Sequence, residues 1–305
     1  MKAVTFAKYG GPDVLRVEDV DEPHPEAGQV RIAVRAASVN PFDCRVRSGS
    51  MSERIPLELP AITGHDGAGV VDEVGPEVTG TAVGDEVFGF TVGITGAAAE
   101  YALLGDFARK PTSLAWEQAA AMPVVVETSA RAFRYLGDVG AGNTLLINGA
   151  AGGVGLAAVQ LAIARGASVI GTASEGNHEF LRSLGAQATT YGEGLVERVR
   201  ALAPDGVDRA FDTAGKGALP DLIELTGDPA RVITIADPDA ERLGVYISHG
   251  SDVRASEALT EAAELAQGAR FQLPIERTFG FSEAAEAHST SEGGHVRGKL
   301  LLIPD

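Results

Sequence analysis

The spacing of apolar residues along the chain changes character near residue 115. Before that point, short apolar or alternating runs are separated by glycine and proline, a pattern typical of β-strands joined by turns. Several short strands of this kind favour a small, barrel-like all-β unit. The predicted strands are Lys2–Phe6, Gln29–Val34, Ala68–Val74, Asp85–Phe90 and Glu100–Leu104.

After residue 115, apolar strands alternate with amphipathic helices, and two of these helices end at a glycine, Gly166 and Gly185. This alternation predicts parallel βαβ units in a doubly wound sheet, and therefore an α/β fold. The predicted helices are Trp116–Ala121, Glu127–Leu136, Val154–Arg165, His178–Leu184 and Leu219–Leu225. The predicted strands are Thr144–Asn148, Ser168–Ala173, Ala188–Tyr191, Arg209–Asp212 and Arg231–Ile235.

The C-terminal part changes pattern once more. Ser256–Gln267 predicts a helix, and Phe271–Thr278 and Lys299–Ile303 predict strands that return to the first unit.

A glycine-rich turn follows the predicted strand Thr144–Asn148 and opens the next helix. Glycines in this position let the backbone approach a pyrophosphate, and the helix N-terminus offers free N–H groups. The match to G-x-G-x-x-G is imperfect because Ala150 fills the first position. The turn is thus a candidate dinucleotide site, with tight packing alone as the alternative. Its candidate residues are Ala150, Ala151, Gly152, Gly153, Val154 and Gly155.

The end of the second strand predicts which cofactor is preferred. NAD enzymes usually place an acidic residue about 20 residues after the turn, but here Ser174 stands at that point, with Glu175 next to it. A hydroxyl leaves room for a 2′-phosphate, so we expect NADPH, although Glu175 partly opposes an anion. Further candidate neighbours of the phosphate are Asn177, His178, Arg182 and Tyr191, and Arg182 is alternatively part of a solvated helix face.

Composition narrows the possible partners. Hydrophobic residues make up 45% and charged residues 22% of the 305 residues, as in an ordinary globular protein. The net charge of −17 makes nucleic acid and membranes unlikely partners. Because Cys44 is the single cysteine, the chain can form neither an internal disulfide nor a multi-cysteine metal site. No apolar run reaches about 18 residues, and the N-terminus lacks a signal-peptide pattern. We therefore expect a cytoplasmic protein.

Further motifs occur in order over nearly the whole chain. They are Ser38–Asp43 (SVNPFD), Gly64–Val71 (GHDGAGVV), Val83–Gly89 (VGDEVFG), Ala99–Tyr101 (AEY), Glu117–Pro123 (EQAAAMP) and Arg297–Lys299 (RGK). Together with the glycine turn, they resemble the medium-chain dehydrogenase/reductase superfamily. Within it they are similar to the zinc-free quinone oxidoreductase branch, related to zeta-crystallin.

This resemblance implies a GroES-like β-barrel catalytic domain and a Rossmann domain, with a cleft between them. The catalytic domain would comprise residues 1–121 and 258–305, and the NADP-binding Rossmann domain residues 122–257. The resemblance also implies NADPH as the hydride donor and a homodimer as the assembly.

Zinc-dependent relatives hold their catalytic metal at three protein positions. Here these positions carry Asn40, His65 and Val124. Because a catalytic zinc needs three protein ligands, we expect no metal, and a structural or hydrogen-bonded role for His65.

The resemblance implies site residues at both domains. Asn40 and Thr128 would contact the nicotinamide, and Lys299 would belong to the cofactor site. Asn40 is alternatively a turn residue before Pro41, and Thr128 a helix-start residue. Arg45 stands where relatives often carry a tyrosine, so it either receives the substrate or pairs with an acid on the surface. Cys44 lacks a histidine partner recognisable in the sequence and is expected to be buried rather than nucleophilic.

The sequence therefore predicts an NADPH-dependent oxidoreductase that reduces a quinone or an enone, both conjugated carbonyl compounds. A zinc alcohol dehydrogenase is disfavoured by the missing ligands. A non-catalytic NADPH-binding sensor or structural protein of the same fold is the alternative, since the tyrosine is missing.

Overall fold

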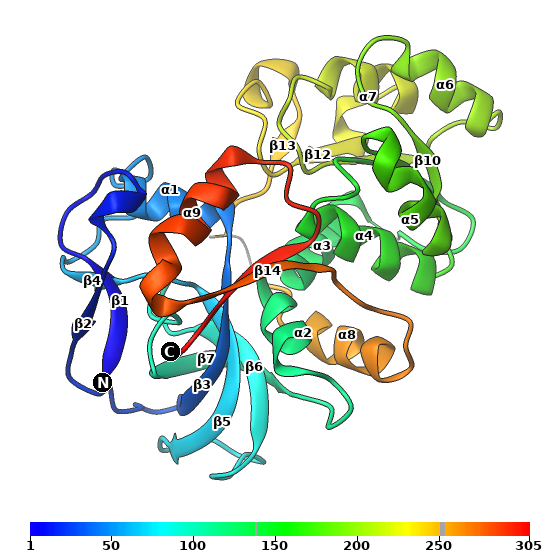
Figure 1. The fold of residues 1–305 in the computed structure, drawn as a ribbon. Helices are drawn as coiled ribbons and strands as arrows, with labels where there is room; N and C mark the ends of the chain where they lie inside the picture. Colours follow the sequence, from blue (N-terminus) through cyan, green and yellow to red (C-terminus); the bar gives the residue numbers. More distant parts are fainter. Residues whose placement is uncertain (138, 251–253) are drawn as a thin grey trace. The chain divides into compact units, whose positions relative to one another are not determined.

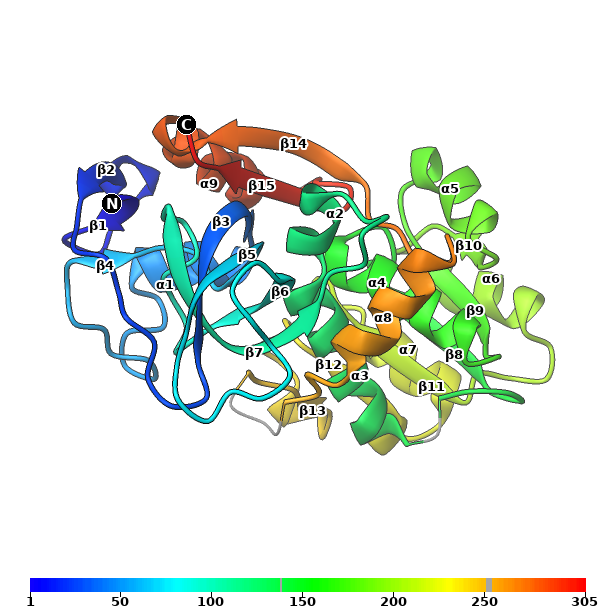
Figure 2. The ribbon, with the colours of Figure 1, turned by 90° about the horizontal axis from the view of Figure 1, so that it is seen from below.

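The computed structural model describes residues 1–137, 139–250 and 254–305 (Figures 1 and 2). The chain forms two compact units. The first comprises Met1–Val124 and Leu259–Asp305, and the second comprises Val125–Ala258.

The first unit is built around a closed β-barrel. Its larger sheet has the strand order β14-β15-β3-β5-β6-β7, and β3 also pairs with β7, which closes β3, β5, β6 and β7 into a ring. A smaller sheet has the order β2-β1-β4. The strands are β1 (Lys2–Phe6), β2 (Arg16–Asp19), β3 (Val30–Val39), β4 (Ala61–Ile62), β5 (Asp66–Val74), β6 (Glu86–Thr91), β7 (Tyr101–Arg109), β14 (Ile275–Gly280) and β15 (Lys299–Ile303).

Glycines make the tight barrel possible where strands approach closely. A Cβ added at Gly69 on β5 would lie 2.3 Å from the carbonyl oxygen of Ala33, and one at Gly89 on β6 would lie 2.2 Å from that of Asp106. These two positions therefore accept only glycine without a shift of the neighbouring strand. The helices of this unit are α1 (Pro41–Ser48), α2 (Trp116–Ala121), α8 (Ala258–Gln267, beginning at the border of the units) and α9 (Ala284–Gly293).

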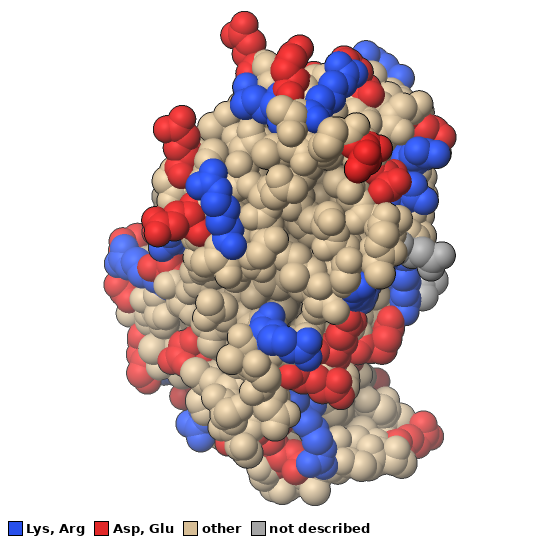
Figure 3. Space-filling view, turned by 90° about the vertical axis from the view of Figure 1, so that its right-hand side faces the viewer, with Lys and Arg blue, Asp and Glu red and all other residues tan. Residues whose placement is uncertain are grey.

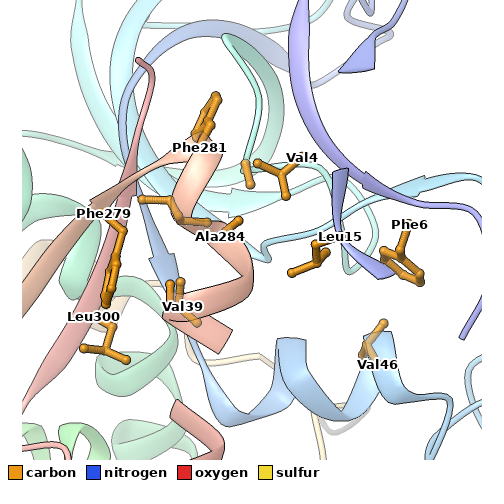
Figure 4. Close-up of a cluster of buried hydrophobic side chains, with 12 residues drawn as sticks. Val4, Phe6, Leu15, Val39, Val46, Phe279, Phe281, Ala284 and Leu300 are labelled. Atoms are coloured by element: carbon orange, nitrogen blue, oxygen red, sulfur yellow. The ribbon is translucent and has the colours of Figure 1, made fainter. Parts of the chain in front are cut away.

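The two ends of the chain share one hydrophobic core in the first unit. Val4 and Phe6 of β1 are buried together with Phe279 of β14 and Leu300 of β15 (Figure 4). Figure 4 also shows Val39, Val46, Phe281 and Ala284 in this cluster, from β3, α1, the short turn before α9 and the start of α9. The C-terminal strand β15 pairs antiparallel with β3, so the last residues of the chain join the larger sheet next to an N-terminal strand.

The second unit is a six-stranded parallel sheet in the order β10-β9-β8-β11-β12-β13. Its strands are β8 (Thr144–Asn148), β9 (Ser168–Thr172), β10 (Gln187–Thr189), β11 (Arg209–Asp212), β12 (Val232–Thr234) and β13 (Tyr246–Ile247). Its helices are α3 (Pro123–Leu136, beginning at the border of the units), α4 (Gly153–Ala164), α5 (His178–Ser183), α6 (Leu195–Leu202) and α7 (Leu219–Thr226).

Helices cover both faces of this sheet, as the alternation of side chains along each strand requires. Leu146 on β8 and Ala210 on β11 belong to one buried cluster with Leu195 of α6 and Leu222 of α7. The next residue on β11, Phe211, points to the other face and contacts Phe133 of α3 edge-on, with ring centroids 6.5 Å apart. The predicted combination of a GroES-like barrel with a doubly wound parallel sheet is thus confirmed.

Several predicted elements need correction. The strand expected at Phe271–Thr278 runs from Ile275 to Gly280, because Pro274 has no N–H to donate and the ladder begins after it. The helix expected to begin at Glu127 begins at Pro123. Sequence patterns missed α1, α6 and α9 entirely. Two of them are helices of eight residues and α9 has only ten, lengths at which helical periodicity is a weak signal.

Charged side chains are interspersed on the surface shown in Figure 3. Lys and Arg occur singly or in small groups among Asp and Glu, around a broad area that carries neither. Within the described residues, no helix combines the length and the apolar character that crossing a membrane would require.

Leu300→Ala tests whether the shared core stabilises the first unit. Leu300 is 1% exposed, so its truncation leaves a cavity, and we expect the free energy of unfolding to fall by about 2–5 kcal/mol. The single tryptophan, Trp116, lies in this unit, so its fluorescence during urea denaturation reports the change. Val83→Ala, at a side chain that is 67% exposed, is the control and should change stability by no more than about 0.5 kcal/mol. If both substitutions changed stability equally, the shared core would not be what stabilises the first unit.

Candidate active site

The parallel sheet reverses its winding direction between β8 and β11. From β8 the chain continues to β9 and β10 on one side, and the later strands β11, β12 and β13 lie on the other side. In doubly wound sheets, ligands bind beyond the carboxyl ends of the strands at this point. The glycine turn after β8 lies there.

Individual glycines of the turn have different roles. A Cβ added at Gly155 would lie 2.3 Å from the carbonyl oxygen of Gly149, so Gly155 is required for packing. At Gly152, the N-cap of α4, the nearest neighbour of an added Cβ is that same oxygen, at 3.5 Å. Gly152 therefore leaves free space at the N-terminus of a twelve-residue helix. A pyrophosphate fits such a cradle, because it needs free N–H groups and close access to the backbone.

The departure from the glycine fingerprint at Ala150 has a structural compensation. Ala150 is fully buried, and a Cβ added at Gly171 on β9 would lie 2.7 Å from the Ala150 methyl group. The side chain of Ala150 thus occupies space that Gly171 vacates and points away from the ligand side. Ala151, Gly153 and Val154 are half-buried in the turn and at the start of α4.

A row of hydrogen bonds links the carboxyl ends of four neighbouring strands. Thr172 of β9 donates to Asn148 Oδ1 (2.6 Å), and Asn148 Nδ2 of β8 donates to Asp212 Oδ1 (2.8 Å). Thr234 of β12 donates to Asp212 Oδ2 (2.7 Å). All four side chains are at most 3% exposed. Gly149 N–H also donates to Thr172 Oγ1 (3.2 Å), so this row holds the first glycine of the turn in place.

The residues predicted for the adenosine end lie beyond β9 and β10. Ser174 is exposed, and its hydroxyl oxygen accepts a hydrogen bond from Asn177 Nδ2 (3.0 Å). His178 Nε2 lies 3.1 Å from the carbonyl oxygen of Ala173. Arg182 and Tyr191 are exposed. All of these residues belong to the second unit, and the structure brings Ser174, Asn177 and His178 together.

Thr128 lies inside α3 and not at its start, because the helix begins five residues earlier. It is 8% exposed, next to a buried ion pair between Glu127 and Arg131, whose Oε1 and Nε atoms are 2.9 Å apart. Arg131 also donates to the carbonyl oxygen of His249 (2.9 Å) and to the hydroxyl of Ser248. This ion pair was not foreseen, although its spacing of four residues along a helix is a signal available in the sequence.

The first unit holds a buried polar network around Asn40. Asn40 Nδ2 lies within hydrogen-bond distance of Asp66 Oδ1 (2.8 Å), Asp43 Oδ2 (3.0 Å) and Ser38 Oγ (3.1 Å). The side-chain oxygen Oδ1 of Asn40 accepts a hydrogen bond from Lys299 Nζ on the C-terminal strand β15. The five side chains are at most 4% exposed.

Further hydrogen bonds hold the members of this network in place. Asn40 N–H donates to Asp43 Oδ2 (2.7 Å) at the start of α1, so Asn40 is a helix N-cap rather than a simple turn residue. Asp66 accepts hydrogen bonds from Ser38 and from the backbone N–H of Val124 (3.0 Å). Burial, aided by the charge of Asp66, raises the pKa of Asp43 to about 7. Burial also lowers the pKa of Lys299, against the opposing effect of both carboxylates.

The remaining candidates of the first unit have different environments. Arg45 is exposed on α1. Cys44 is buried, as expected, but its partner was missed: Sγ lies 3.5 Å from Nδ1 of His288 on α9, which is 244 residues away in the chain. Burial raises the pKa of the Cys44 thiol to about 12 and lowers that of His288 to about 4. The thiol therefore stays protonated, and a thiolate nucleophile is not formed at neutral pH.

His65 is half-buried between two aromatic rings. Its ring centroid lies 5.5 Å from that of Phe42 and 5.4 Å from that of Phe90. Across the described ranges, the structure contains no cluster of three or more His, Cys, Asp or Glu side chains that could hold a metal ion.

A closed barrel unit, a doubly wound unit and a glycine-rich helix start at the switch point are features found in dinucleotide-dependent oxidoreductases. Residues 26–110 match the model of the alcohol dehydrogenase GroES-like domain, and residues 184–302 match that of zinc-binding dehydrogenases. The chain is 35% identical over 242 residues to a quinone oxidoreductase of Rattus norvegicus, which covers 77% of this chain and 73% of the rat protein.

Two further similarities extend over the whole chain. It is 31% identical over 320 aligned positions to a chloroplastic NADPH-dependent alkenal/one oxidoreductase of Arabidopsis thaliana, covering 80% of that protein. The structure of a quinone oxidoreductase from Coxiella burnetii superposes with a TM-score of 0.86 at 32% identity, covering 100% of this chain and 99% of the other. The chain belongs to the medium-chain dehydrogenase/reductase superfamily, as the motifs predicted.

Asp43→Asn tests the buried carboxyl group through the pH dependence of stability. The pKa of Asp43 is about 7 in the folded state and near 3.8 when unfolded. The folded state therefore binds the proton more tightly, and the free energy of unfolding falls as pH rises from about 4 to 7. Asparagine can still accept the hydrogen bonds from Asn40 but carries no charge. Urea denaturation, followed by Trp116 fluorescence from pH 4 to 8, should show a stability advantage of Asp43→Asn that grows up to pH 7 and then stays constant. If the stability of the native protein and of Asp43→Asn changed with pH in parallel, the raised pKa of Asp43 would be refuted.

Gly152→Val tests the cradle at α4. We expect a large loss of dinucleotide binding with the fold retained, because the new side chain fills the space next to the helix N-terminus. Calorimetric titration measures binding, and thermal unfolding measures the fold. Gly293→Val is a matched control, since an added Cβ at this exposed position meets no atom within 4 Å. Unchanged affinity of Gly152→Val would mean that the turn serves packing only.

Proposed function

We propose that this protein is a metal-independent, NADPH-dependent oxidoreductase that transfers a hydride to a quinone or to the β-carbon of an enone. The observation that carries the proposal is the free space at Gly152, at the N-terminus of α4 and at the switch point of the sheet. When bound, NADPH supplies the hydride, and the acceptor gains this hydride together with one proton. The names of the rat, Coxiella and Arabidopsis relatives support these two acceptor classes.

The residues of the chain have separate tasks in this proposal. The backbone from Ala150 to Gly155 binds the pyrophosphate, and Ser174, Asn177, His178, Arg182 and Tyr191 lie at the adenosine end. Asn40 and Thr128 orient the nicotinamide. Lys299 Nζ donates to Asn40 Oδ1, and Asn40 Nδ2 donates to Asp43 and Asp66. A carboxamide bound at both ends cannot rotate, which supports a positioning role for Asn40. Arg45 is exposed, where it can meet a substrate.

Turnover separates an enzyme from a cofactor-binding sensor. NADPH oxidation is followed at 340 nm with 1,4-naphthoquinone and, separately, with 2-cyclohexenone. We expect turnover with at least one acceptor, and the faster one assigns the substrate class. Gly152→Val should abolish it. NADPH binding without any turnover would support the sensor instead.

Metal independence is tested in the same assay. Only His65 remains of the ligand set of zinc-dependent relatives, so a chelator should leave the rate unchanged. One zinc per chain, together with loss of activity on chelation, would overturn this part of the proposal.

Preference for NADPH over NADH is expected to be about ten- to a hundredfold, or roughly 1.4–2.8 kcal/mol. Ser174→Asp should reverse it, because a carboxylate binds the ribose hydroxyls of NADH and repels a 2′-phosphate. The measurement is kcat/KM for both cofactors in the native protein and the variant. Ser183→Asp adds the same charge at an exposed position of α5 and controls for net charge. Equal or better use of NADH by the native protein would contradict the prediction.

We also propose a homodimer in the cytoplasm. The resemblance to the family supports the dimer, and the free buried thiol of Cys44 fits a reducing compartment. Light scattering that gives the mass of one chain would exclude the dimer.

A further inference from the structure

Arg198 of α6 encloses the loop that follows β10. Its Nη1 donates to the carbonyl oxygen of Glu193 (2.7 Å) and its Nη2 to that of Thr190 (3.0 Å). Nη2 also lies 3.4 Å from the carbonyl oxygens of Tyr191 and Gly192. One guanidinium group thus contacts the backbone of four consecutive residues.

A further hydrogen bond connects this group to the sheet. Arg198 Nε donates to Thr189 Oγ1 (3.2 Å), and Thr189 is the last residue of β10. Arg198 therefore fixes the loop relative to the end of its own strand. A planar guanidinium can bind several acceptors in fixed directions, which a lysine ammonium cannot do.

The loop held by Arg198 carries Tyr191, which follows the end of β10 at the same separation as Ser174 follows the end of β9. Thr189 of β10 pairs with Thr172 of β9 in parallel register, and Ala173 N–H donates to the carbonyl oxygen of Thr189 (3.0 Å). Tyr191 and Ser174 each follow two residues after this pair, at the carboxyl edge of neighbouring strands. Tyr191 is 59% exposed, so packing alone does not restrain its side chain.

Arg198 is not well suited to bind the phosphate itself. A guanidinium has five N–H donors, and here the loop carbonyls and Thr189 take up donors on all three nitrogens. Arg198 instead holds the backbone of residues 190–193, and with it the point from which the Tyr191 side chain extends.

We propose that Arg198 is a positioning residue for cofactor specificity: it holds the loop that carries Tyr191, so that the hydroxyls of Tyr191 and Ser174 both meet the 2′-phosphate of NADPH. The inference rests on the proposed NADPH preference and deepens it. Loss of Arg198 should release the loop and weaken binding only where the ligand carries a 2′-phosphate.

Calorimetric titration of NADPH and NADH into Arg198→Met provides the test. Methionine removes the donors but keeps an unbranched side chain. We expect the Kd for NADPH to rise about tenfold and the Kd for NADH to change by less than twofold. Arg198→Lys retains the charge but not the planar fork, and should resemble Arg198→Met. If charge alone mattered, Arg198→Lys would keep the native preference and the proposal would fail.

Arg200→Met is the matched control on the same helix. Arg200 forms an exposed ion pair with Glu224 (2.9 Å), and its loss removes the same charge without touching the loop. Both affinities should remain native. Thr189→Val removes only the acceptor of Arg198 Nε and should give a smaller change in the same direction. It keeps the test decisive if Arg198→Met does not fold, as judged by thermal unfolding.

A double-mutant cycle with Tyr191→Phe tests the route of the effect. If Arg198 acts through the tyrosine hydroxyl, Arg198→Met should have little further effect on NADPH affinity in the Tyr191→Phe background. Additive effects would overturn the proposal, as would equal weakening of NADPH and NADH by Arg198→Met. A native protein that binds both cofactors equally would overturn the proposed NADPH preference and this inference together. Native preference that persists in Arg198→Met would overturn this inference alone.

Discussion

Asp212 ends β11 without exposed surface, and its carboxylate joins the parts of the second unit that surround the candidate cofactor site. One oxygen accepts a hydrogen bond from Asn148 of β8, the other from Thr234 of β12, and the backbone N–H groups of Ala214 and Gly215 complete the set. A buried carboxylate without such donors would be strongly destabilising. The ends of three strands and the loop after β11 must therefore keep fixed positions for this one group to be satisfied. The glycine turn is connected to these strand ends, because Thr172 donates a hydrogen bond to Asn148 and accepts one from the N–H of Gly149.

The first unit also buries charged side chains that depend on hydrogen-bond partners, in the network around Asn40. A lysine and two aspartates are buried around Asn40, and Lys299 and Asp66 have partners from distant parts of the chain. Lys299 arrives on the last strand, whereas Ser38 and Asn40 come from β3 and the start of α1. The network includes Lys299, which the pairing of β15 with β3 brings next to Ser38 and Asn40. The shared core of the two chain ends is thus a condition for the orientation of Asn40 and not only a source of stability.

The two units also show how one family pattern tolerates substitution. Ala150 replaces the first fingerprint glycine, and Gly171 on the neighbouring strand vacates the volume that its methyl group needs. Asn40, which was expected at a metal-ligand position of zinc-dependent relatives, is a member of a hydrogen-bonded network. In both places a neighbouring group accommodates or satisfies the side chain that is present.

Local patterns in the sequence predicted much of this architecture. The bounds of β1, β8, β11, β15 and α2 agree with the predicted segments, because short apolar runs bounded by turn residues are a signal that neighbouring residues carry. The glycine turn was visible because backbone access to a ligand requires small residues at neighbouring positions in the chain. The superfamily followed from ordered motifs over the whole length.

Tertiary structure alone decided which side chains meet. Cys44 and His288 are 244 residues apart, and Lys299 and Asn40 are 259 apart. Nothing in the pattern near Arg198 indicated that its guanidinium would turn toward four carbonyl groups of a loop. Short helices such as α1 and α6 depend on the surfaces they cover, since eight residues do not form a stable helix in isolation. Periodicity in a sequence reports what neighbouring residues prefer, whereas partners, burial and pKa shifts arise from contacts between distant segments that exist only in the folded chain.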